Sequence, residues 1–243
     1  METRVDEIAA RVYRLSTFVA SGAGSPGFTF NQFLVDADEP LLFACGQRSL
    51  FASVSAAAAR VVSLDRLRWI TFSHVESDEC GALNDWLTAA PRAVVAHGRL
   101  ACAIWLNEMA DRPPRVLADG EVLDLGGKQV KHIATPHLPH NWEAALCHEE
   151  TTGTLFCSDL FTQLGECPPT TTADVVAPAI ATEERFRFVP VTAETAPAIR
   201  RLGALAPRTL ALMHGPSFAG EARRPLESLA GYYDERLRRA VAG

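Results

Sequence analysis

Short apolar runs and amphipathic segments alternate along this chain. Runs bounded by turn residues predict strands, and apolar side chains three or four positions apart predict helices. The predicted strands are residues 12–20, 28–35, 40–45, 68–72, 93–96, 144–147, 154–157 and 209–213. The predicted helices are residues 49–60, 82–90, 100–110, 192–205 and 225–241. Strands precede helices in two successive blocks, which favours an α/β (α+β) fold with two facing sheets and helices outside, an αββα four-layer sandwich.

In three further segments the spacing of apolar residues fits neither a single strand nor a single helix. Residues 21–27 combine Ser, Gly and Pro and predict a flexible break. Residues 116–134 carry two Gly-containing turn pairs between apolar residues, which predicts consecutive hairpins. Residues 165–190 are rich in Pro and Thr and predict an excursion or lid. None of the three has the composition of a domain linker, so we expect one domain over residues 1–243.

Composition and charge narrow the class of protein. Of the 243 residues, 48% are apolar and 21% are charged, which is ordinary for a globular chain. The formal charge is −6 without a Lys/Arg cluster, so we expect neither a nucleic-acid partner nor an anionic membrane surface. There is no apolar leader or membrane-length run, and the six cysteines form no Cys-x-x-Cys pair. We therefore expect a cytoplasmic protein with reduced thiols.

Candidate metal ligands cluster directly after the predicted strand 68–72. His74, Glu76, Asp78 and Glu79 fall within six residues. If the backbone stays extended, alternation places residues 74, 76 and 78 on one side. An imidazole with carboxylates suits iron, manganese or zinc. The alternative is a solvated acidic turn in which Asp78 caps the helix that begins near residue 82.

Three more polar residues follow apolar strands in the same manner. They are His140, Asp159 and His214. Loops at strand ends can gather ligands from distant parts of a chain around one site. His137 competes with His140 for the same ligand position, because both lie in the segment Pro-His-Leu-Pro-His.

The succession His-x-Glu-x-Asp, His, Asp and His-Gly-Pro resembles the metallo-β-lactamase-fold domain of flavodiiron proteins. The intervals between these residues and the early Phe-Asn-Gln-Phe-Leu-Val segment at 30–35 resemble that family too. The resemblance implies a non-haem di-iron site that binds and reduces O2 or NO. By resemblance, His74, Glu76 and His140 bind one iron, Asp78 and His214 bind the other, and Asp159 bridges them.

The resemblance also sets expectations for cofactors and partners. It implies two iron ions, although zinc or manganese also suits the ligand types. The 243 residues contain no flavodoxin-like segment after the metal domain, so we expect no FMN on this chain. Electrons would then come from a separate flavoprotein or a rubredoxin-like donor. A homodimer is an expectation from base rates alone.

Two departures from the family pattern affect the expected chemistry. Glu79 stands where the family usually has His, and it could bind the second iron, turn away and leave water, or donate protons. The expected oxygen pocket has Trp142, Phe161, Phe186 and Phe188 available rather than the family's His and Tyr, with Trp142 as a candidate catalytic residue. A pocket poor in proton donors favours oxygen binding over its reduction.

Three hypotheses remain open on the sequence. The first is a di-iron protein that reduces O2 or NO with a partner. The second is a sensor or scaffold that keeps the iron site without turnover. The third is a zinc-dependent hydrolase of the same fold with a metal-bound hydroxide as nucleophile.

Overall fold

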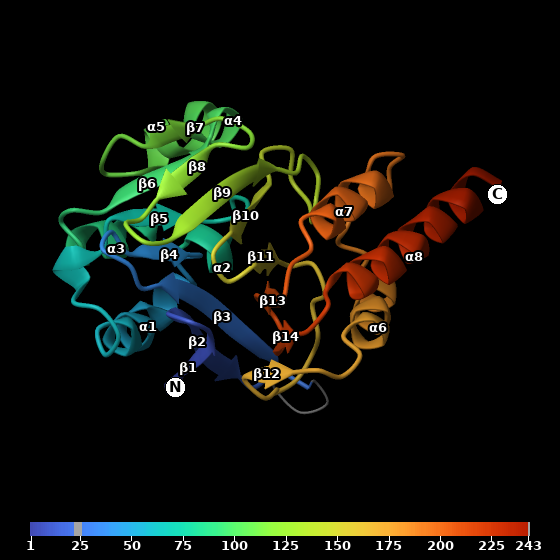
Figure 1. Cartoon of the computed structure of the whole chain (residues 1–243), viewed down its shortest axis with the longest axis horizontal. Helices are drawn as coiled ribbons and strands as arrows, with labels where there is room; N and C mark the ends of the chain where they lie inside the picture. Colours follow the sequence, from blue (N-terminus) through green and yellow to red (C-terminus); the bar gives the residue numbers. More distant parts are fainter. Residues whose placement is uncertain (22–25, 243) are drawn as a thin grey trace.

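A computed structural model describes residues 1–21 and 26–242 of the chain. It contains two seven-stranded sheets, which are packed face to face (Figure 1). The first sheet, in spatial order, contains β1 (Thr3–Ala9), β2 (Val12–Val19), β3 (Phe28–Val35), β4 (Leu41–Phe43), β5 (Trp69–Thr71), β6 (Val94–Gly98) and β7 (Arg115–Leu117). The second contains β12 (Thr170–Thr171), β14 (Ser217–Ala219), β13 (Thr209–Leu212), β11 (Thr154–Ser158), β10 (Ala145–Glu149), β9 (Gln129–Ala134) and β8 (Val122–Asp124).

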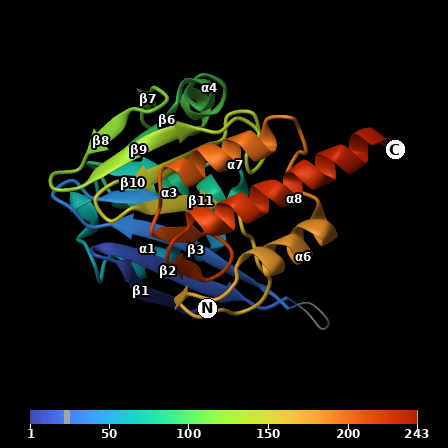
Figure 2. The same cartoon turned by 45° about the vertical axis from the view of Figure 1, so that its right-hand side comes forward.

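Helices cover the outer face of each sheet. The helices are α1 (Phe51–Ala58), α2 (Ser77–Cys80), α3 (Leu83–Ala89), α4 (Arg99–Ala101), α5 (Asn107–Met109), α6 (Val176–Phe186), α7 (Thr195–Ala204) and α8 (Arg223–Ala242), with short turns η1 (Arg48–Leu50), η2 (Leu64–Arg66) and η3 (Cys102–Leu106). In the turned view α6, α7 and α8 lie together over the second sheet (Figure 2). The helix predicted over residues 100–110 is the continuous segment α4–η3–α5 with a π-turn in its middle.

Three apolar clusters fill the three interfaces between the layers. One joins α1 and α3 to the first sheet, around Trp86 and Ile70. A second joins α6, α7 and α8 to the second sheet, around Leu202 and Leu210. The third lies between the sheets, where Phe43 stacks on Phe156 with ring centroids 5.0 Å apart. This layering confirms the predicted αββα sandwich of the metallo-β-lactamase type.

The structure corrects the prediction of consecutive hairpins. Only β8 and β9 pair as a hairpin within residues 116–134, because β7 instead pairs in parallel with β6 in the first sheet. Local pattern could not show that the chain changes sheets between β7 and β8. The segment predicted as an excursion or lid, residues 165–190, contains β12 and α6. Strands β1 and β14 were not predicted.

Parallel strand ends set the position of the functional site. Strands β4, β5 and β6 are parallel in the first sheet, and β11 and β13 are parallel in the second. Loops that leave the carboxyl ends of these strands meet between the sheets. Most of the break predicted at residues 21–27 lies outside the described residues. In the described part of the chain, no helix combines the length and apolar character that a bilayer span requires.

Candidate metal centre

Four loops bring six of the predicted ligands together. His74 and Glu76 follow β5, and Asp78 lies in the first turn of α2. The other three come from the loop between β9 and β10, the end of β11 and the end of β13; they are His140, Asp159 and His214. Asp78 thus enters the site through a helical turn, and not through the extended alternation that the sequence suggested. The alternative of a solvated capping turn does not describe this arrangement, because His74 is buried.

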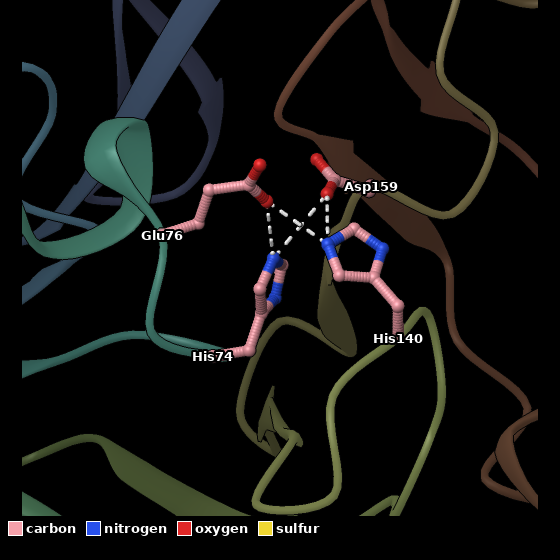
Figure 3. Close-up of side chains that lie close together, drawn as sticks. All are labelled: His74, Glu76, His140 and Asp159. Atoms are coloured by element: carbon pink, nitrogen blue, oxygen red, sulfur yellow. Dashed lines mark hydrogen bonds and ion pairs between the residues drawn. The ribbon is translucent and has the colours of Figure 1, made fainter. Parts of the chain in front are cut away.

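The first donor set surrounds the Oε2 atom of Glu76. Nε2 of His74 and Nε2 of His140 each lie 2.9 Å from that oxygen. Oδ2 of Asp159 lies 3.5 Å from Nε2 of His74 and 3.6 Å from Nε2 of His140 (Figure 3). One donor atom from each of these four residues lies within 4.8 Å of the others, so the group could hold a metal ion.

The second donor set uses the other oxygen of Asp159. Nε2 of His214 lies 3.2 Å from Oδ1 of Asp159 and 3.1 Å from Oδ2 of Asp78. Asp159 therefore presents one carboxylate oxygen to each set. A bridging carboxylate is the usual way in which proteins hold two metal ions a few ångströms apart.

The protonation of these groups reflects an excess of negative charge. Burial lowers the pKa of His74, but hydrogen bonding to Glu76 and the charges of Glu79 and Asp159 outweigh it and raise that pKa to about 9. Burial likewise opposes protonation of His214, yet Asp159 and Asp78 raise its pKa to about 10. Without a metal, the imidazoles must carry the positive charge that the carboxylates require. A metal cation supplies that charge instead and releases the protons.

In two histidines the ring nitrogen that faces away from the donor sets, Nδ1, has a hydrogen-bond partner in the protein. Nδ1 of His214 lies 2.9 Å from the carbonyl oxygen of Thr29, and Nδ1 of His74 lies 3.2 Å from Oγ of Ser73. The Thr29 carbonyl can only accept, so Nδ1 of His214 donates to it and leaves the Nε2 lone pair facing the site. The donor set of imidazole nitrogens and carboxylate oxygens therefore fits iron, manganese or zinc.

Strand β3 supports the His214 loop in a way that sequence reasoning missed. The side-chain amide of Asn31 donates to the carbonyl oxygens of Leu212 and Gly215, at 2.8 and 2.9 Å. The rings of Phe28 and Phe30 meet the His214 ring edge-on, with centroids 5.4 and 5.2 Å away. The polar pair Asn31-Gln32 between the apolar residues of this strand was the signal available in the sequence.

Glu79 does not join either donor set. Its carboxylate is buried, accepts a hydrogen bond from the backbone N–H of Ser73 at 3.1 Å, and accepts another from the hydroxyl of Ser158. Its Oε1 lies 3.8 Å from Nδ1 of His74, the nitrogen that does not face the donor set. Burial raises the pKa of Glu79 to about 7. The structure therefore places Glu79 behind His74, where it can orient the ring.

A cavity of about 350 Å³ opens over the two donor sets. Its lining includes the predicted Phe186 and Phe188, and it also includes Phe28 and Phe30, which were not predicted. Trp142 is 49% exposed and is not part of this lining, and neither are Phe161 and His137. The segment 165–190 thus contributes to the pocket, but Trp142 does not. His140, and not His137, belongs to the donor cluster.

Comparisons with known proteins show which proteins this chain is similar to. The family model described as ODP family beta lactamase matches residues 28–215. A protein assigned as diflavin flavoprotein A 1 of Nostoc sp. (strain PCC 7120) is 27% identical over 199 residues, 78% of this chain and 34% of the relative. Coenzyme F420H(2) oxidase of Methanothermobacter marburgensis is 30% identical over 153 residues, 58% of this chain and 37% of the relative. The chain spans about a third of the length of these curated relatives.

Solved structures share the fold. Rubredoxin oxygen:oxidoreductase of Desulfovibrio gigas superposes with a TM-score of 0.81 at 17% identity, over 95% of this chain and 62% of the other. The metal-soaked Flv1 flavodiiron core of Synechocystis sp. PCC 6803 has a TM-score of 0.77 at 21% identity, over 96% and 60%. The fold is that of a flavodiiron metallo-β-lactamase-like core. Because the family model matches well over half of its residues, the chain belongs to the ODP beta-lactamase family.

Proposed function

We propose that this chain is a non-haem di-iron protein that binds O2 or NO and reduces or senses it. The observation that carries the proposal is the division of Asp159, whose Oδ2 faces His74 and His140 while its Oδ1 faces His214. His74, Glu76 and His140 would hold one iron, Asp78 and His214 the other, and Asp159 both. Names of relatives and structural neighbours, which include flavodiiron cores, an oxygen oxidoreductase and an F420H(2) oxidase, support iron over zinc or manganese.

When bound, a pair of irons supplies two adjacent one-electron redox centres for a diatomic ligand. The protein's own residues provide selection and orientation. One wall of the pocket is apolar, which suits small uncharged molecules; it is formed by Phe28, Phe30, Phe186 and Phe188. Hydrogen bonds at the Nδ1 atoms of His74 and His214 keep both Nε2 atoms turned toward the site.

Proton supply bears on whether the protein is a reductase or a sensor. Outside the two donor sets, the polar residues lining the pocket are Gln47, Ser77 and Thr162. The Thr162 hydroxyl already donates to the backbone carbonyl of Asp159, at 2.7 Å. Reduction of O2 to water needs protons as well as electrons. This lining therefore supports oxygen binding without rapid turnover.

The electron donor, the domain organisation, the location and the assembly of the protein also belong to this proposal. Electrons would come from a separate flavoprotein or rubredoxin-like partner, with no FMN held by these residues. Residues 1–243 would form one domain, because the donor sets draw on loops of both sheets. All six cysteines are free thiols, which agrees with a cytoplasmic location. We also propose a homodimer, on the sole ground that two-fold dimers are the commonest protein assemblies. The zinc-hydrolase alternative has no support from the relatives.

Metal analysis with optical spectroscopy tests the proposal. Protein purified without added metal should carry about two irons per chain, as a two-metal site requires. Reduced protein should develop a near-ultraviolet band on mixing with O2. A persistent band identifies a sensor, whereas repeated turnover with an added flavoprotein donor identifies a reductase. A single zinc per chain and no oxygen-dependent band would contradict the proposal. Esterase or phosphodiesterase activity under strict anaerobiosis would revive the hydrolase.

A further inference from the structure

Arg14 on β2 is almost completely buried, with 2% of its surface exposed, which is unusual for an arginine. Its Nη2 atom donates to Sγ of Cys167 at 3.2 Å and to the carbonyl oxygen of Gly215 at 3.3 Å. Its Nε atom has no hydrogen-bond partner. The carboxylate of Asp6 is 3.6 Å from Nη1. A buried guanidinium needs negative charge close by, and the sulfur of Cys167 is its nearest side-chain partner among these.

Arg14 and Cys167 line the same cavity, which has a volume of about 200 Å³. That volume is ample for a molecule of a few atoms. The Cys167 thiol lies 3.6 Å from the hydroxyl oxygen of Thr29, and that hydroxyl donates to the carbonyl oxygen of Gly165 at 2.9 Å. Cys167 is partly exposed, so a small reagent in the cavity can reach its sulfur.

Arg14 is the buried positive charge that faces the sulfur of Cys167 in this cavity. The other charged residues that line it are Glu2, Arg4, Asp6 and Glu166. Arg4 and Glu166 pair with each other at 3.0 Å in a solvent-exposed position, and Asp6 lies 3.6 Å from Nη1 of Arg14. Burial lowers the pKa of Arg14, while the sulfur of Cys167 and the carboxylate of Asp6 raise it. The guanidinium nevertheless stays charged, since arginine has the highest pKa of the side chains.

The other five cysteines have different surroundings. All are buried, and burial raises the pKa of Cys80 and of Cys147 to about 12. Burial also raises the pKa of the remaining three, Cys45, Cys102 and Cys157. Thiols that stay protonated react slowly with oxidants, because the thiolate is the nucleophile. The five buried cysteines therefore provide internal controls within the same chain.

We propose that Cys167 is a modification site at which hydrogen peroxide, or another small hydroperoxide, oxidises the sulfur to sulfenic acid, with Arg14 stabilising the attacking anion. The sulfur attacks one peroxide oxygen, an S–O bond forms and the O–O bond breaks. Sulfur loses two electrons to the peroxide. The departing hydroxide takes up the proton that the thiol released when it ionised and leaves as water, so the thiol and peroxide together yield sulfenic acid and water.

This site lies directly behind a proposed metal ligand. Arg14 binds the carbonyl of Gly215, the residue after His214, and the Thr29 carbonyl accepts from Nδ1 of His214. The inference does not depend on iron, because the thiol and the guanidinium both belong to the protein.

Quantitative sulfenic-acid trapping tests the inference. The full chain, stripped of metal with a chelator, is treated with hydrogen peroxide and dimedone, and each cysteine peptide is quantified by mass spectrometry. We expect Cys167 to be labelled at least about tenfold faster than any buried cysteine. We also expect at least about fivefold faster labelling of Cys167 in the folded chain than in urea. The second measurement needs no variant, and slower labelling in the folded chain would overturn the inference.

Variants separate the role of Arg14 from simple exposure. Arg14→Gln should slow labelling at Cys167 by about tenfold, and Arg14→Lys by less, because lysine keeps the charge. Arg4→Gln is the matched control, since Arg4 lines the same cavity but is exposed, and it should change the rate by less than about twofold. Circular dichroism verifies folding. A folded Arg14→Gln protein with the wild-type rate would refute the role of Arg14.

Discussion

The Oδ1 atom of Asp159 lies 3.2 Å from Nε2 of His214, while its Oδ2 atom lies 3.5 Å from Nε2 of His74. One carboxylate thus connects ligands that are far apart in the sequence and follow strands of different sheets. This connection divides the six side chains into two donor sets that share Asp159. It also means that substitutions on the two sides of Asp159 should have different effects.

Metal stoichiometry should distinguish the two positions. Asp78→Asn removes a charge from the second set only, so we expect about one iron per chain. Asp159→Asn removes the shared charge, so binding at both positions should fail and oxygen reactivity should be lost. Asp65→Asn, at an exposed carboxylate, is the control and should keep the wild-type metal content. Full activity in Asp159→Asn would show that the site is wrongly assigned.

Glu79 and Glu76 should behave differently although they are three residues apart. Glu79→Gln keeps the shape of a side chain that lies behind His74, so the protein should still carry about two irons. Glu76→Gln removes the carboxylate nearest to both His74 and His140, and should lose the first iron. Iron analysis of both proteins, purified in parallel, decides the matter. Loss of one iron in Glu79→Gln would mean that Glu79 moves to bind metal.

Asn31 should be essential for the stability of the His214 loop. Asn31→Ala removes the side-chain donor of the buried Leu212 carbonyl and leaves the carbonyl of Gly215 with Arg14 as its donor. We expect a loss of about 1–3 kcal/mol in the free energy of unfolding, measured by urea denaturation. Asn107→Ala, at an exposed position, should change it by less than about 0.5 kcal/mol. Equal effects in the two variants would argue against this support of the loop.

Because His97 is buried, we expect the free energy of unfolding to fall in acid. The imidazole is buried, with Nε2 donating to the carbonyl of Ser73 at 3.1 Å, and burial together with the charge of His132 lowers its pKa to about 3. The unfolded chain takes up a proton here below about pH 6.5, whereas the folded chain does not. Stability should therefore fall as the pH drops from 6.5 toward 3, by up to about 1.4 kcal/mol per pH unit.

Denaturation of metal-free protein between pH 7.5 and 4.5 isolates this effect. The variant His97→Gln cannot take up the proton, so its stability should depend less steeply on pH than that of the wild type. The two curves should converge on acidification, even if the variant is less stable at neutral pH. Parallel curves would show that His97 is protonated in the folded state.

The sequence alone determined the layers and most of the elements of this protein. Apolar runs such as residues 28–35 and 209–213, and the helical spacing of residues 225–241, depend on local periodicity, which is readable without a structure. Polar residues at strand ends likewise identified six residues that the structure brings together. Local pattern did not place β7, because the sheet that a short strand joins depends on partners far away in the chain.

Only the tertiary structure decided what each polar residue faces. Glu79 and Asp78 are neighbours of the same charge, yet one points behind His74 and the other toward His214, because α2 turns the backbone there. Trp142 lies in the same loop as His140, two residues further on, but it is 49% exposed and lies outside the pocket lining. The Arg14–Cys167 contact joins positions 153 residues apart. Such relationships are set by packing between distant elements, and no local pattern in the chain encodes them.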